Sequence, residues 1–89
     1  MTQQIEHVLK KWEKKYGYLG LTLKELELFS AVRNKRFTLK VLERELYERK
    51  IDNQGRIWVS YGTLSDLKEG DILILGRDDK GNYFVKKKE

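Results

Sequence analysis

Hydrophobic residues recur at helical spacing near the start of the chain. Each of five such residues lies three or four positions from another of them: Ile5, Val8, Leu9, Trp12 and Tyr16. This spacing predicts a helix over residues 2–16 with one buried stripe. Gly17 follows where a left-handed residue commonly ends a helix. His7 lies off the stripe, so we expect a surface histidine and no catalytic or metal-binding role for it.

Two further helices are predicted before residue 50. Thr22 and Glu25 form a T-x-x-E capping box, which begins a helix that we expect to end near Asn34. After the connector 34–37, Thr38 is placed to cap a third helix. Its buried side would be formed by Val41, Leu42 and Leu46. Two capped helices joined by a four-residue turn are typical of a helix-turn-helix.

The second half of the chain predicts strands. Residues 52–55 and 78–81 have the composition of tight turns, each with a glycine able to take a positive φ. After the first turn, Ile57 and Val59 share one face of a strand and Trp58 lies on the other. The apolar run 71–75 reads as a strand covered on both faces.

These elements predict an α+β fold in a single domain over residues 1–89. Residues 1–49 would form a helical half of three helices, helix-turn-helix or winged-helix-like. Residues 50–89 would form a four-stranded antiparallel β-unit of two hairpins. Neither a Gly/Ser-rich linker nor a proline separates the halves. We expect a cytoplasmic protein, since the sequence has neither a membrane-length apolar run nor a secretory signal.

The distribution of charge along the chain favours one class of function, the binding of an anionic partner. The chain has a net charge of +5, and residues 1–50 hold all of this excess, with twelve Lys and Arg against seven acids. A basic surface favours an anionic partner, and nucleic acid is the commonest one. We therefore expect nucleic-acid contacts, chiefly with duplex DNA, from six cations: Arg33, Lys35, Arg36, Lys40, Arg44 and Arg56.

Aromatic residues beside Arg56 are candidates for stacking on bases. Trp58 lies on the outward face of the predicted strand and Tyr61 follows it. A strand-borne aromatic side chain next to an arginine is a device of single-strand binding. The alternative is that Trp58 packs against the first helix and joins the two halves.

Enzymatic chemistry has no visible basis in the sequence. Cysteine is absent, and no acid–base pair, no nucleophile with its base and no Gly-rich phosphate loop can be found. Adjacent Asp78 and Asp79 suit a turn better than a metal site. We expect no catalytic residues, no metal and no cofactor.

Part of the second half resembles a known family. The pattern is carried by Ile51, Asp52, Gly55, Arg56, Ile57 and Val59, followed by Leu67, Gly70, Asp71, Leu73 and Ile74. It is similar to the AbrB/SpoVT-like swapped-hairpin transcription factors over about the last forty residues. The resemblance implies a homodimer of interleaved hairpins whose arginine-bearing loops contact DNA, with Arg56 as the position that carries over.

The sequence thus predicts a small DNA-binding protein, either a transcription regulator or an architectural factor. Two other functions stay open. The neutral second half and the mixed charge of the predicted third helix would suit an accessory subunit of a replication, transcription or phage complex that binds another protein. The turn at 68–71, Lys-Glu-Gly-Asp, also occurs in S4-like and OB-like modules that bind RNA.

Overall fold

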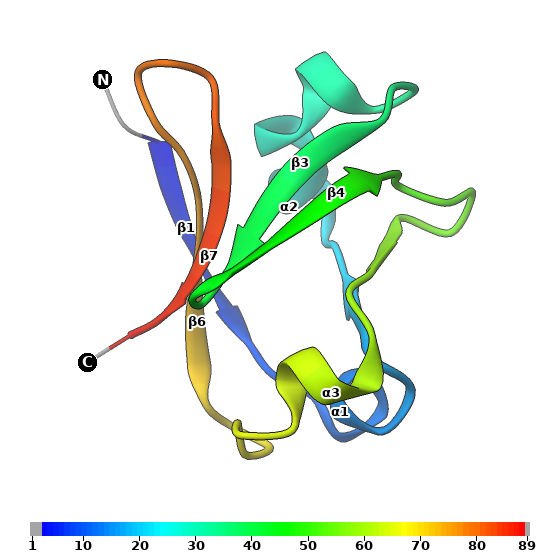
Figure 1. The fold of residues 1–89 in the computed structure, drawn as a ribbon, viewed down its shortest axis with the longest axis vertical. Helices are drawn as coiled ribbons and strands as arrows, with labels where there is room; N and C mark the ends of the chain where they lie inside the picture. Colours follow the sequence, from blue (N-terminus) through cyan, green and yellow to red (C-terminus); the bar gives the residue numbers. More distant parts are fainter. Residues whose placement is uncertain (1–2, 89) are drawn as a thin grey trace.

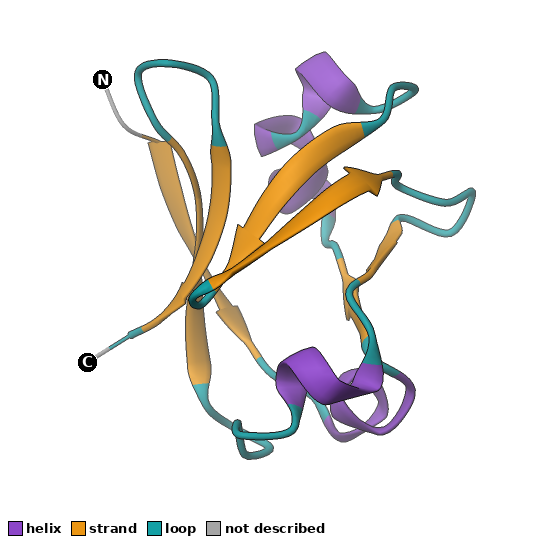
Figure 2. Ribbon diagram, in the orientation of Figure 1, coloured by secondary structure: helices purple, strands orange, loops and turns teal. Residues whose placement is uncertain are grey.

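The structure, a computed structural model, describes residues 3–88 and is built mainly of strands (Figures 1 and 2). The strands are β1 (Gln3–Val8), β2 (Tyr18–Gly20), β3 (Phe37–Val41), β4 (Arg44–Arg49), β5 (Arg56–Trp58), β6 (Ile72–Arg77) and β7 (Tyr83–Lys87). The helices are α1 (Lys11–Tyr16), α2 (Leu23–Leu28), the 3-10 helix η1 (Ser30–Val32) and α3 (Tyr61–Leu64). None of these helices is long and apolar enough to cross a membrane.

Five strands form one mixed sheet in the order β1-β6-β7-β3-β4. Neighbours are antiparallel except β3 and β7, which run parallel. β2 and β5 form a separate two-stranded ribbon. The predicted arrangement of three N-terminal helices followed by a four-stranded unit is therefore wrong, because strands from both halves of the chain share one sheet.

The predicted helix 2–16 is mostly a strand. Residue 2 lies outside the described residues, β1 occupies the next six, and only α1 is helical. β1 pairs along its whole length with β6, from Gln3 opposite Arg77 to Val8 opposite Ile72. This long-range pairing offers the apolar β6 a hydrogen-bonded neighbour, which local helical spacing could not reveal. Gly17 does end α1 in the left-handed region, with φ 78°, as predicted.

The predicted third helix is the hairpin of β3 and β4. Phe37, Leu39 and Val41 are buried while the residues between them are exposed, which is the period of a strand. Leu42 turns the chain with a positive φ of 56°. The helix-turn-helix prediction is wrong for this reason: Val41, Leu42 and Leu46 also fit a helical spacing, but the chain reverses between them.

Several local predictions are confirmed. The capping box of Thr22 and Glu25 begins α2, although this helix ends at Leu28 and continues only as η1. Gly55 and Gly81 occupy the two predicted turns with φ of 77° and 83°. The second predicted hairpin is β6–β7. The first is reduced to a bridge between Ile51 and Ile57, and β5 pairs with β2 instead.

The core lies between the concave face of the sheet and the elements that cover it. The sheet contributes Leu39, Val41, Leu73, Leu75 and Val85, all at most 1% exposed. From the other side come Phe29 after α2, Leu19 and Ile57 of the ribbon, and Leu64 of α3. Phe84 on the outer face covers Gly76, where an added Cβ would lie 2.1 Å from its ring.

Candidate nucleic-acid interface

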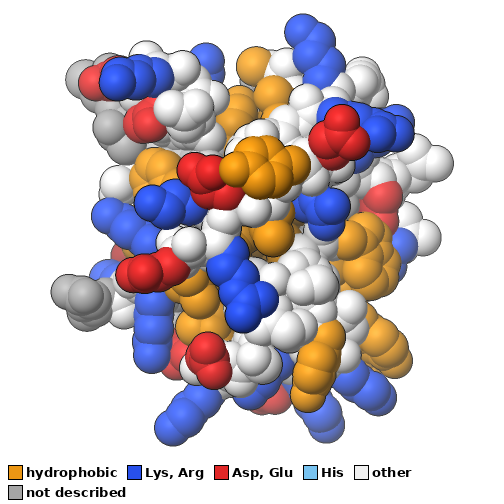
Figure 3. All heavy atoms as spheres, in the orientation of Figure 1, with side chains coloured by type: hydrophobic (Ala, Val, Ile, Leu, Met, Phe, Trp, Pro, Cys, Tyr) orange, Lys and Arg blue, Asp and Glu red, His pale blue; other side chains and the backbone are white. Residues whose placement is uncertain are grey.

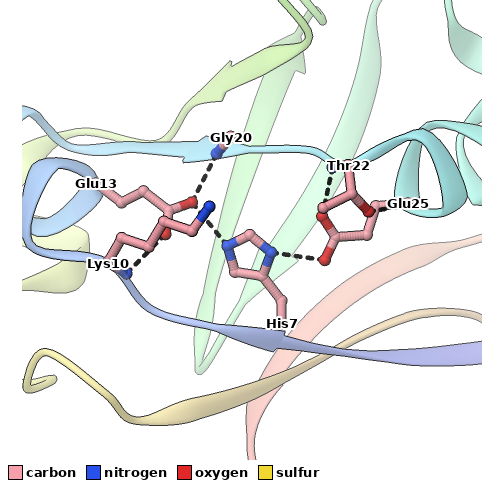
Figure 4. A network of polar contacts seen from close by, with 6 residues as sticks. All are labelled: His7, Lys10, Glu13, Gly20, Thr22 and Glu25. Carbon is pink, nitrogen blue, oxygen red and sulfur yellow. Dashed lines mark hydrogen bonds and ion pairs between the residues drawn. The ribbon is translucent and has the colours of Figure 1, made fainter.

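A histidine held between two glutamates lies in the polar part of the core. His7 of β1, Glu13 of α1 and Glu25 of α2 are 4%, 2% and 2% exposed. The Nδ1 atom of His7 lies 2.6 Å from Glu25 Oε2, and its Nε2 atom lies 2.7 Å from Glu13 Oε2 (Figure 4). The prediction of a surface histidine is wrong, because His7 is on the inward face of a strand.

Both glutamates also close the first turn of a helix. Glu13 Oε1 accepts a hydrogen bond from the Lys10 backbone N–H at 2.8 Å, and Glu25 Oε1 accepts one from the Thr22 backbone N–H at 2.7 Å. Each glutamate is the third residue of its helix and completes a capping box. His7 therefore links two helix starts to the edge strand β1.

The two carboxylates keep this histidine charged. Burial alone would lower the pKa of His7, but the hydrogen bonds to Glu13 and Glu25 and their negative charges raise it from 6.5 to about 9. Burial would raise the pKa of Glu25, yet the hydrogen bonds from His7 and Thr22 bring it below its ordinary value. Only an imidazolium donates from both ring nitrogens.

This arrangement is a structural link. A general base needs a free ring nitrogen near substrate, and both nitrogens of His7 are committed to buried carboxylates. Within residues 3–88, no three His, Cys, Asp or Glu side chains form a group that could hold a metal ion.

Arg56 is the centre of one surface cluster. Its guanidinium carbon lies 5.4 Å from the Tyr18 ring centroid and 5.1 Å from that of Trp58. Its Nε donates to Asp52 Oδ2 at 2.9 Å, and the Trp58 indole N–H donates to the same oxygen at 3.0 Å. The ring that packs on Trp58 is that of Tyr18 in β2, at 5.1 Å between centroids, and 42% of Trp58 stays exposed.

Asp52 fixes the position of these groups. Besides the two side-chain donors, its Oδ1 accepts from the backbone N–H groups of Gln54 and Arg56, each at 2.9 Å. Partial burial would raise the pKa of Asp52, but the hydrogen bonds from Arg56, Trp58 and Gln54 lower it to about 2. Asp52 is thus ionised at neutral pH, and the Arg56 guanidinium is held in one orientation.

Further cations gather around this cluster. Arg33 donates through Nη1 to the Asp52 carbonyl at 3.3 Å, and Arg49 donates through Nη1 to the Trp58 carbonyl at 3.1 Å. Arg36 reaches the exposed Glu48 at 3.4 Å. The predicted residues Arg33, Lys35, Arg36 and Arg56 are therefore brought to one side of the molecule, because the turn at 34–37 packs beside the loop before β5.

The same side continues to α1 and α3. The Gly17 carbonyl accepts from the backbone N–H groups of Val59 at 2.9 Å and Ser60 at 3.0 Å, so the end of α1 lies against the start of α3. We call the surface formed by residues 11–18, 33–36 and 48–61 the basic edge. Figure 3 shows blue cationic and orange hydrophobic side chains alternating along the lower right margin of the molecule, where Figure 1 places α1 and α3.

Lys40 and Arg44 are not part of the basic edge. Lys40 points outward from β3, opposite Glu45 of β4, in a groove that Asp78 also lines. Arg44 begins β4 beyond the hairpin turn. Their predicted position beside the other cations followed from a helix that the chain does not form.

Sequence reasoning did not select several residues of the basic edge, among them Trp12, Tyr16, Arg49 and Lys50. Trp12 and Tyr16 were expected in the buried stripe, yet they are 55% and 53% exposed. Ile5, His7 and Leu9 are spaced by two residues, which is the period of a strand, and α1 begins only after this strand, so its two rings do not share a face with Ile5 and Leu9. Arg49 and Lys50 were not selected because the predicted third helix ended beside them.

The comparisons with known proteins add no relative. The chain matches no protein-family model, no curated protein and no solved structure.

Proposed function

We propose that the protein is a small, non-enzymatic DNA-binding protein, either a transcription regulator or an architectural factor, and that it binds duplex DNA through the basic edge. The charge of that surface carries the proposal. Its three segments hold nine Lys and Arg and three acids, a balance of +6, whereas the whole chain has +5. The rest of the molecule therefore sums to −1, and one of the three acids of the edge, Glu13, is buried beside His7.

The cations of the basic edge are placed where they could contact the phosphates of DNA. Lys35, Arg36 and Lys50 are exposed, and Arg33 and Arg49 are held by backbone carbonyls. Such contacts supply affinity and orientation on DNA without reading its sequence. Since no recognition helix exists among residues 3–88, base reading would fall to side chains of loops and strands, with Arg56 as the best-oriented donor.

The test is a binding titration with a labelled duplex at about 50 mM and about 200 mM salt. We expect binding at the lower concentration and a loss of affinity of more than about tenfold at the higher one, because released counterions drive the association. Absence of binding at both concentrations would overturn the proposal.

A charge reversal localises the contact. The double variant Lys35→Glu, Arg36→Glu should lose about tenfold or more in affinity, since two phosphate contacts become repulsive. The control is Lys80→Glu, Lys86→Glu, which changes the net charge equally but lies at the β6–β7 turn and on β7. Equal losses in both variants would mean that net charge alone, and not the basic edge, attracts DNA. Unchanged binding to a protein partner by the first variant would favour the accessory-subunit function.

A homodimer is also part of this proposal, as the resemblance of residues 51–74 implies. β1 and β4 are the edges of the five-stranded sheet, and a sheet edge is a surface through which chains commonly pair. Light scattering should then give twice the chain mass of 10.7 kDa. A nucleic-acid-binding role also fits the cytoplasmic location expected from the sequence.

A further inference from the structure

Three large aromatic side chains stand exposed where α1 meets α3. Trp12, Tyr16 and Tyr61 are 55%, 53% and 65% exposed. Soluble proteins normally bury tryptophan for the most part, so a group of exposed rings indicates a binding surface. We call these three residues, with Lys11 and Lys15, the α1–α3 face.

The geometry of α1 explains how this face arises. Trp12 and Tyr16 are four residues apart and therefore lie next to each other on one exposed face of α1, while Glu13 is turned into the core toward His7. Tyr61 at the start of α3 lies beside them, because Gly17 at the end of α1 has no side chain and lets the two segments approach closely. A Cβ on Gly17 would lie 2.3 Å from the Tyr61 backbone nitrogen.

Lysines lie directly over the exposed rings. Lys15 Nζ is 5.8 Å from the Trp12 ring centroid and 5.3 Å from that of Tyr16, and Lys11 Nζ is 5.8 Å from the Trp12 ring. The only acid of α1, Glu13, is buried. A ligand on this face therefore meets both flat aromatic rings and positive charges.

Unpaired nucleotides have the matching chemistry, a flat base joined to a phosphate. We propose that the α1–α3 face stacks the bases of a single-stranded segment, so that the preferred ligand is duplex DNA that carries a single-stranded tail. The tail would lie on Trp12, Tyr16 and Tyr61 while the duplex lies on the arginine end of the basic edge. This inference rests on the proposed function, since it assigns a ligand to one end of the same surface.

Two other occupants fit the face less well. The buried centres of protein interfaces are depleted in lysine, whereas here lysine lies across the rings themselves. A membrane-surface helix presents a continuous apolar face over many residues, and α1 has only six residues. Single-stranded nucleic acid accounts for both the rings and the cations.

The experiment compares a blunt duplex with the same duplex extended by a short oligothymidine tail. The wild-type protein should bind the tailed DNA on the order of tenfold more tightly. Replacing Trp12→Ala together with Tyr61→Ala should abolish this difference, so that the variant binds the tailed and the blunt duplex with equal affinity, because the two exposed side chains stack on the tail. The control is Tyr47→Ala, which removes an equally exposed aromatic ring from β4, away from this face.

Fluorescence gives a second readout that does not depend on affinity. In a Trp58→Phe background Trp12 is the only tryptophan of the chain, and tailed DNA should quench its emission while blunt duplex should not. Equal affinity of the wild type for both DNAs, or an equal loss on both in the double variant, would overturn this inference and leave the proposed function intact. Absence of binding to either DNA would overturn both. A shift of Trp12 emission with phosphatidylglycerol vesicles and no response to DNA would assign the face to a lipid surface instead.

Discussion

His7 and Glu25 are joined by a hydrogen bond of 2.6 Å between Nδ1 and Oε2, and both side chains are buried. Glu25 is at the same time the capping residue of α2, and His7 makes the equivalent contact with the capping residue of α1. One imidazolium thus fixes the direction of two helices relative to β1. The exposure of the α1–α3 face depends on this link.

Removing the histidine should destabilise the fold strongly. His7→Gln leaves two buried carboxylates without their cation, which should lower the free energy of unfolding by about 3–5 kcal/mol. Urea denaturation measures this directly. The control is Glu6→Gln on the same strand, whose exposed ion pair with Lys88 should contribute less than about 1 kcal/mol. Similar losses for the two variants would mean that the buried link contributes no more than a surface pair.

Stability should depend on pH through the same residue. The pKa of His7 is raised from 6.5 to about 9 on folding, so its contribution is fully present below pH 6.5 and is lost as the pH rises through about 9. At about 1.36 kcal/mol per unit, the loss is on the order of 3 kcal/mol. The difference in unfolding free energy between wild type and His7→Gln should therefore shrink between pH 6.5 and pH 9. A constant difference across that range would contradict the raised pKa.

Gly17 should tolerate no side chain. Gly17→Ala places a Cβ 2.3 Å from the Tyr61 nitrogen at a φ of +78°, so both the left-handed backbone and the packing of α1 on α3 oppose it. We expect a loss of more than about 2 kcal/mol in thermal or urea unfolding. Gly62→Ala is the matched control, since nothing lies within 4 Å of its added Cβ. A neutral Gly17→Ala would show that α1 and α3 do not approach as described.

Asp52 should matter for the orientation of Arg56. Asp52→Ala removes the acceptor of two backbone N–H groups, the Trp58 indole and the Arg56 guanidinium, and should cost about 1–3 kcal/mol of stability. It also removes a negative charge from the basic edge. We expect the affinity for DNA to fall despite the more favourable net charge, because Arg56 loses the carboxylate that fixes its orientation. A tighter complex would show that charge outweighs orientation there.

The parts of the fold that could be predicted from sequence are those fixed by neighbouring residues. The capping box at Thr22, the glycine turns at Gly55 and Gly81 and the inward faces of Ile57 and Val59 all depend on contacts within a few residues. These features are where local preference and the final fold agree.

The parts that could not be predicted depend on distant pairing. β1 becomes a strand because β6 lies beside it, and β3 has β7 on one side and its hairpin partner β4 on the other; β6 and β7 are far away from these strands in the chain. Leu39, Leu42 and Leu46 fit a helical spacing, whereas Phe37, Leu39 and Val41 fit a strand spacing, so the periodicity alone could not choose. The prediction of the binding surface failed for the same reason. Lys40 and Arg44 would lie beside Arg36 only if this segment were a helix. Arg33 and Arg56 come together because both contact Asp52, which is distant from Arg33 in the chain.

The most direct test of the account is to map the DNA contact residue by residue, using backbone amide NMR signals during a titration with tailed duplex DNA. The account predicts that the perturbed signals fall in residues 11–18, 33–36 and 48–61, and that those of β1 and β6 stay in place. Perturbations centred on the outer face of the sheet, around Lys40 and Phe84, would contradict it, as would a titration that leaves every signal unmoved.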